Sequence, residues 1–152
     1  MSIMNALLFD DRPDMRGTLE NHLALFGVSD VTSCRSCRQA IKALEAQLPC
    51  FFERYILDLS VPSQGLPKTM QAATASGLRT GWVLLTQVIY PQDNACMQRT
   101  IIFSDYLDKL KTYIRGASDQ EKLWYNQLKD RNALVSKMEG GLSALDRLLK
   151  QV

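Results

Sequence analysis

The chain lacks a long apolar run, a recognisable signal sequence and a large excess of either charge. No stretch approaches the roughly 20 consecutive apolar residues that a membrane-spanning helix needs. Met1 to Phe9 lack a basic start and a small-residue cleavage site, so we expect no signal peptide. With 18 basic and 16 acidic residues, the net charge of +2 falls short of the basic excess typical of nucleic-acid-binding domains. We therefore expect a soluble cytoplasmic protein that binds neither a membrane nor nucleic acid.

Cysteine and histidine are also scarce, with four cysteines and one histidine in 152 residues. Cys34 and Cys37 form a C-x-x-C pair, a spacing found in redox motifs and zinc sites. A complete zinc site needs a second such pair, and the single histidine, His22, lies elsewhere in the chain. We therefore favour reduced cysteines in and beside a helix, and a redox or metal role is the alternative.

The composition and its patterning indicate one α/β domain. Apolar residues make up 46% of the chain and charged residues 22%, which argues against wholesale disorder. Short apolar runs alternate with longer segments of helical period, the pattern of βαβ units around a parallel sheet. The runs predict strands at residues 6–9, 28–31, 55–57, 82–85 and 106–107.

The last third of the chain has a different pattern. Ser118-Asp119-Gln120-Glu121 is a capping box that predicts the start of a helix. Beyond it Leu128, Val135, Leu142 and Leu149 repeat every seven residues, as in a short coiled coil. We expect a domain over residues 1–130 and a helical extension over residues 131–152, as one helix or two. The apolar seam either packs on the sheet or joins two copies into a homodimer through the C-terminal helices.

Polar groups directly follow four of the five predicted strands. Asp10 and Asp11 follow the first strand, and Asp58 follows the third. Thr86 follows the fourth and Lys109 the fifth. The carboxyl ends of parallel strands share one edge of the sheet, so these groups should converge there. Crowded carboxylates require a cation such as Mg²⁺, and the cation, hydroxyl and ammonium together suit phosphoryl transfer to a carboxylate.

Four segments carry a resemblance to a known family. They are Leu8-Phe9-Asp10-Asp11, Ile56-Leu57-Asp58-Leu59-Ser60-Val61-Pro62, Leu84-Leu85-Thr86 and Ser104-Asp105-Tyr106-Leu107-Asp108-Lys109. In this order they resemble the response-regulator receiver domain of two-component signalling. The resemblance implies a doubly wound, five-stranded parallel sheet in the flavodoxin-like order 2-1-3-4-5, with helices on both faces. It also implies a single-domain signalling module rather than an enzyme.

The resemblance implies a phosphoacceptor and a metal site. Asp58 looks like the carboxylate that takes a phosphoryl group from a histidine kinase or phosphotransfer protein. Asp11 would bind Mg²⁺ directly, with Asp10 nearby. Asp58 itself and the backbone carbonyl of Ser60 would complete the protein ligands.

The resemblance also implies a switch. Lys109 would pair with the phosphoryl oxygens, and Thr86 would move inward to bind them. Tyr106 would change rotamer with Thr86 and carry the signal to a downstream protein target.

Single residues favour or disfavour three alternative functions. Gln87 and Leu110 stand where the family usually has a small residue and a proline, which motivates a receiver-fold interaction module that acts without phosphorylation. The loop Asp10-Asp11-Arg12-Pro13 would repel a flavin phosphate, which disfavours a flavodoxin-like electron carrier. Ser60 stands where a haloacid-dehalogenase-type phosphatase usually has an acid, which disfavours that enzyme.

Overall fold

The computed structural model describes residues 4–48, 52–138 and 140–150 of the chain. Five parallel strands form one sheet in the order β2-β1-β3-β4-β5. The strands are β1 (Met4–Phe9), β2 (Val28–Cys34), β3 (Arg54–Leu57), β4 (Thr100–Ser104) and β5 (Leu134–Ser136). The predicted α/β class and the strand order 2-1-3-4-5 are confirmed.

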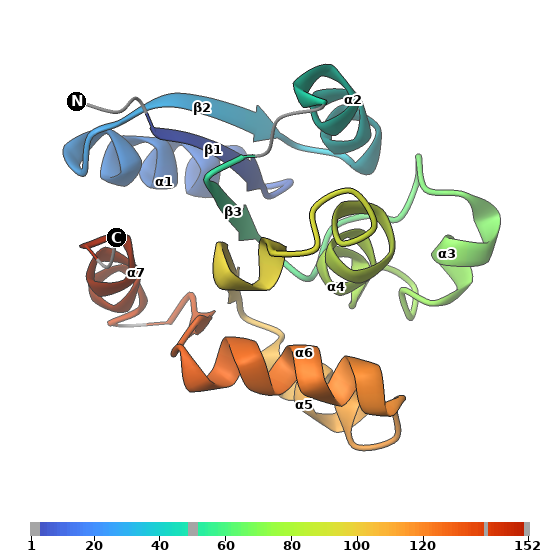
Figure 1. The fold of residues 1–152 in the computed structure, drawn as a ribbon. Coiled ribbons are helices and arrows are strands. Elements are labelled where there is room, and N and C mark those ends of the chain that lie inside the picture. The colour runs from blue at the N-terminus through green and yellow to red at the C-terminus, as the bar shows by residue number, and fades with distance from the viewer. Residues whose placement is uncertain (1–3, 49–51, 139, 151–152) are drawn as a thin grey trace.

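Helices cover both faces of this sheet (Figure 1). The helices are α1 (Pro13–Leu25), α2 (Cys37–Gln47), α3 (Lys68–Ala72), α4 (Thr80–Val83), α5 (Leu107–Ile114), α6 (Asp119–Asp130) and α7 (Gly141–Lys150). Two shorter helical segments are the π-helical η1 (Leu84–Ile89) and the 3-10 helix η2 (Cys96–Gln98). In the part of the chain that the structure describes, no helix has both the length and the apolar character needed to cross a bilayer.

The side chains of β1 show why two helical layers are needed. Leu7 and Phe9 enter one apolar core, while Ala6 and Leu8 enter the other. Successive strand residues point to opposite faces, so a continuous apolar run has to be buried on both sides. The core around Ala6 and Leu8 is closed by side chains of α1 and α7, and the opposite core by side chains of α2, η1, α5 and α6.

Two serines cap the starts of helices, and one of these starts was predicted from the sequence. The hydroxyl oxygen of Ser36 accepts from the Gln39 backbone N–H at 3.2 Å at the start of α2. The Ser118 hydroxyl accepts in the same way from Glu121 at 3.2 Å and begins α6, as the capping box predicts. These bonds satisfy backbone donors that have no partner within the helix.

The fourth strand lies outside the segment predicted for it. Residues 82–85 belong to α4 and η1, where Trp82 and Leu85 are at most 1% exposed. The fourth strand is Thr100–Ser104, a segment that lies outside all five predicted strands. A short apolar run buried on all sides does not distinguish a strand from a buried helix, which is the physical reason for the error.

The fifth strand is also misplaced by the sequence pattern. Tyr106 precedes the first residue of α5, so residues 106–107 are not a strand. The fifth strand is Leu134–Ser136, inside the segment 131–152 that was predicted to be helical throughout. Only α7 within that segment is helical among the described residues. The expectation of a purely helical extension after residue 130 is therefore wrong.

The heptad pattern of the C-terminal third does not form a continuous helix. Leu128 lies in α6, Val135 in β5 and Leu149 in α7. All three are at most 4% exposed and pack in the two cores of the sheet. The seam is therefore used within the chain, and these side chains are not available to join two copies.

Candidate functional site

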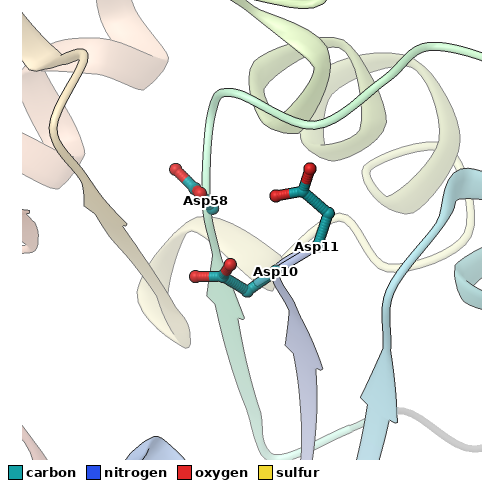
Figure 2. Close-up of side chains that lie close together, drawn as sticks. All are labelled: Asp10, Asp11 and Asp58. Carbon is teal, nitrogen blue, oxygen red and sulfur yellow. The ribbon is translucent and has the colours of Figure 1, made fainter. Parts of the chain in front are cut away.

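Three carboxylates gather at the carboxyl edge of the sheet. Asp10 and Asp11 directly follow β1, and Asp58 directly follows the neighbouring strand β3 (Figure 2). One carboxylate oxygen from each of the three lies within 4.8 Å of the others. Asp10 is 1% exposed and Asp58 is 5% exposed. This convergence is the one that the strand-end pattern predicts.

Backbone hydrogen bonds hold the two buried acids in place. The N–H of Asp10 donates to the Cys34 carbonyl at 3.1 Å, and the N–H of Asp58 donates to the Phe9 carbonyl at 2.9 Å. Both bonds extend the parallel ladder by one residue beyond the strands. The Arg12 N–H donates to the Asp10 carboxylate at 2.9 Å, where the chain turns into α1. The acids are thus positioned by the sheet itself rather than by a mobile loop.

Lys137 supplies the cation of the site. Its ammonium donates to the Asp10 carboxylate at 2.6 Å and to the Asp58 carboxylate at 2.8 Å, and its side chain is 4% exposed. Burial by itself lowers the pKa of the Lys137 ammonium, but the hydrogen bonds and charges of Asp10 and Asp58 outweigh it and raise the pKa overall. Lys137 follows β5 immediately, and sequence reasoning missed it because Leu134–Ser136 was not recognised as a strand.

A cavity of about 230 Å³ opens onto these groups. Its lining residues are Asp11, Arg12, Asp58, Ser60, Asp105, Tyr106 and Lys137. Among the described residues, the three clustered carboxylates outnumber the one ammonium that bonds to them, which leaves an excess negative charge beside the cavity. Hard carboxylate oxygens with room for water are the donor set that Mg²⁺ prefers. The residues present therefore fit a bound divalent cation.

A buried hydroxyl ends β4, the strand that lies between β3 and β5 in the sheet. Ser104, the last residue of β4, is fully buried. Its oxygen accepts from the backbone N–H of Leu59 at 3.4 Å and from that of Tyr106 at 3.2 Å. Ser104 is thereby tied to the residue that follows Asp58. A polar residue ending the apolar run Ile101-Ile102-Phe103 was the signal that could have revealed it.

Three solved structures that this architecture resembles come from response regulators. A response regulator receiver domain protein from Clostridium thermocellum matches with a TM-score of 0.59 and 14% identity, over 97% of this chain and 92% of that one. RcsB from Salmonella enterica serovar Typhimurium, bound to the rprA promoter in the presence of the phosphomimetic BeF₃⁻, matches with a TM-score of 0.57 and 17% identity. That match spans 98% of this chain and 67% of RcsB. The fold is that of a receiver domain.

The bacteriophytochrome response regulator AtBRR shares the receiver fold. It matches with a TM-score of 0.51 and 14% identity, over 99% of this chain and 92% of that one. No protein-family model matches the chain, and no curated protein matches its sequence. The likeness is therefore one of fold.

The receiver fold brings some predicted site residues together and separates others. Ser60 and Tyr106 line the same cavity as Asp58. Thr86 lies in η1, 7% exposed, and its hydroxyl donates to the Trp82 carbonyl at 2.8 Å, which is a bond within the helix. Lys109 lies exposed on α5. The predicted places of Thr86 and Lys109 beside the acids are wrong, because neither residue lies at the end of a strand. Ser104 ends β4, and Lys137 directly follows β5.

Gln87 and Leu110, the two departures from the family pattern, also lie in segments that are helices rather than strands. Gln87 is an exposed residue of η1, and Leu110 is a buried residue of α5. Neither lines the cavity of the receiver fold. Leu110 therefore belongs to the packing of α5 and Gln87 to the surface of η1, and neither residue motivates a function without phosphorylation.

The described cysteines of the receiver fold are buried thiols. Cys34, Cys37 and Cys96 are free and at most 1% exposed, and Cys50 lies outside the described residues. Burial raises the pKa of the Cys34 and Cys37 thiols to about 11. It raises the pKa of the Cys96 thiol to about 12. Protonated, buried thiols are poor nucleophiles and poor metal ligands, which supports the structural interpretation of the C-x-x-C pair.

We expect these thiols to react only when the protein unfolds. In a Cys50→Ser variant at pH 8, labelling by a disulfide reagent should be at least about 100-fold slower in the native protein than in urea, because few thiolates form. The absorbance of the released thiolate measures the rate. Rapid labelling of the folded variant would contradict the burial of the C-x-x-C pair.

Proposed function

We propose that this chain is a phosphorylatable receiver that accepts a phosphoryl group on Asp58. The observation that carries the proposal is the gathering of Asp10, Asp11 and Asp58 with the Lys137 ammonium beside one cavity. In the proposed reaction an Asp58 carboxylate oxygen attacks the phosphorus of a phosphohistidine on a histidine kinase or phosphotransfer protein. The phosphorus–nitrogen bond breaks, and the histidine nitrogen leaves with its electron pair.

The surrounding groups suit this transfer. Bound Mg²⁺ would neutralise charge on the phosphoryl oxygens, which is the main requirement for catalysing their transfer. Asp10, Asp11 and Asp58 would hold the ion, with the Ser60 carbonyl as a further ligand. Lys137 lies close enough to Asp58 to pair with the phosphoryl group that forms there.

The hydroxyl that would respond to phosphorylation is also a different one from that predicted. The Ser104 hydroxyl takes the role that the sequence pattern assigned to Thr86, since it ends β4 and is bonded to the segment that follows Asp58. A phosphoryl dianion at Asp58 would contact Ser104 and Lys137 in one arrangement of these strand ends and not in another. Such differential contact shifts the populations of two states.

The downstream protein target has a surface beside this output. A cavity of about 410 Å³ runs along the sheet-edge strand β5, between α6 and the start of α7. Leu134, Val135 and Ser136 line it, and Lys137 follows them directly. We propose that a protein segment docks on β5, where a movement of Lys137 changes the surface.

The phosphoacceptor role is tested by intact-mass measurement after incubation with acetyl phosphate and Mg²⁺. We expect one phosphoryl adduct, absent without the metal and absent in Asp58→Asn. Asp108→Asn is the matched control, because Asp108 is exposed on α5 and lies outside the cavity, so this variant removes the same charge away from the site. An adduct that persists in Asp58→Asn would overturn the assignment of the acceptor.

One observation favours a second candidate, a receiver-fold interaction module without phosphorylation. Lys137 already bonds both Asp10 and Asp58, so these buried acids are paired without a metal or a phosphoryl group. The intact-mass experiment, together with a measurement of beryllofluoride binding, separates the phosphorylatable receiver from the interaction module. If neither an adduct nor Mg²⁺-dependent binding of beryllofluoride is found, the interaction module is the better description.

A further inference from the structure

The cavity above Asp58 has a fourth acid on its wall. Asp105 follows Ser104 at the end of β4 and lines the cavity together with Asp11 and Asp58. The Tyr106 N–H donates to the Ser104 hydroxyl oxygen at 3.2 Å, which holds this turn against the sheet. Asp105 does not belong to the tight group of three carboxylates below it. It is exposed at the mouth of the cavity.

Among the described residues that line the cavity, Asp105 is an acid without an ion pair of its own. Lys137 and one divalent cation would balance Asp10, Asp11 and Asp58. The remaining cation of the cavity wall is Arg12, whose guanidinium pairs with Asp14 on α1 at 3.0 Å.

Arg12 responds to several acids at once. Its pKa is raised chiefly by the hydrogen bond to Asp14, and further by the charges of Asp10 and Asp105. The positive charge of Arg12 is therefore shared among several acids, and it does not fully cancel the charge of Asp105.

We propose that Asp105 sets the donor specificity of the site by opposing free, highly charged phosphoryl donors at the cavity mouth. This inference rests on the proposed function. When acetyl phosphate is the donor, an Asp58 oxygen forms a bond to phosphorus, the bond from phosphorus to the acetate oxygen breaks, and acetate leaves with the electron pair. The donor must bring its negative charge past Asp105 before that step, and repulsion lowers its encounter rate.

The same charge acts in the opposite sense on a cation. Asp105 attracts a divalent ion towards the three acids below it, so it should favour Mg²⁺ while it disfavours an anionic donor. Replacing a residue that has only a structural role would not change the rate of phosphorylation and the affinity for Mg²⁺ in opposite directions. This opposition is the signature to be measured.

The test compares Asp105→Asn with Asp108→Asn. Asp108 lies exposed in the first turn of α5 and outside the cavity, so its variant removes the same charge from the same segment. Phosphorylation at saturating Mg²⁺ is followed by intact mass, with acetyl phosphate as one donor and phosphoramidate, which carries a smaller negative charge, as the other. Mg²⁺ affinity is measured by calorimetry without a donor.

We expect Asp105→Asn to accept from acetyl phosphate about three- to tenfold faster than the natural chain, with a smaller gain from phosphoramidate, and to bind Mg²⁺ about twofold more weakly. Asp108→Asn should match the natural chain in all three measurements. Equal behaviour of the two variants, or a slower reaction in Asp105→Asn, would overturn the inference while leaving the phosphoacceptor role intact. No adduct on the natural chain with either donor would overturn the proposed function and this inference with it.

Discussion

Replacing Lys137 with methionine should lower the free energy of unfolding by about 3 kcal/mol at pH 7 in the presence of EDTA. Methionine keeps most of the side-chain length but removes the ammonium that bonds Asp10 at 2.6 Å and Asp58 at 2.8 Å. The two buried acids then have no cation between them, and an unpaired buried charge is costly. Urea unfolding curves measure the loss.

Lys109→Met is the matched control for this prediction. Lys109 is exposed on α5, so its replacement should change the free energy of unfolding by no more than about 0.5 kcal/mol. Mg²⁺ should narrow the gap between Lys137→Met and the natural chain, because a divalent ion that binds the native acids stabilises them by mass action. Equal stabilities of the two variants in EDTA would show that Lys137 is not the cation of the site.

The pH dependence of this effect follows from the pKa of Lys137. Its pKa in the folded chain is raised above the ordinary value of 10.5 because the bonds to Asp10 and Asp58 outweigh the effect of burial. A raised pKa contributes stability that is complete below the unfolded value and is lost as the pH rises through the folded value. The difference between the natural chain and Lys137→Met should therefore be constant from pH 7 to pH 9 and shrink only above about pH 10.5.

Gly81→Ala should destabilise the protein by at least about 2 kcal/mol. Gly81 lies in α4, and a Cβ added there would stand 2.0 Å from the Asp58 carbonyl oxygen and 3.2 Å from the Leu59 Cα. The obstructing atoms are backbone, so either α4 or the segment carrying Asp58 has to move. The Gly81 N–H also donates to the Leu59 carbonyl at 3.2 Å, and this bond would be strained.

A second helical glycine gives a control with the opposite sign. Gly17 lies inside α1, and a Cβ added there would meet no atom within 4 Å. Gly17→Ala should stabilise the protein by about 0.5–1 kcal/mol, because alanine loses less backbone entropy in a helix. Urea unfolding with far-UV circular dichroism compares the two variants. A Gly81→Ala protein as stable as Gly17→Ala would mean that α4 does not pack closely on the Asp58 segment.

The acidic half of the site could be predicted because it depends on local pattern. Ala6-Leu7-Leu8-Phe9 and Tyr55-Ile56-Leu57 are apolar runs buried on both faces of the sheet, and each is followed at once by its acids. The two strands pair directly with each other, so the acids meet without help from the rest of the chain.

The other half could not be predicted because it depends on competition between apolar segments. Residues 82–85 and the strand Thr100–Ser104 are similarly apolar, and only packing against the sheet assigns the first to a helix and the second to β4. The last strand, Leu134–Ser136, has three residues and little pattern of its own. Its identity comes from pairing with β4, which lies about thirty residues earlier in the chain.

By itself, then, the sequence determined the α/β class, the strand order by resemblance, the capped start of α6 and the places of Asp10, Asp11 and Asp58. Only the tertiary structure decided that Ser104 and Lys137, rather than Thr86 and Lys109, stand beside those acids. The physical reason is that a strand's position in a sheet is set by long-range pairing and burial. A residue that follows a strand can be identified only after that strand has been assigned.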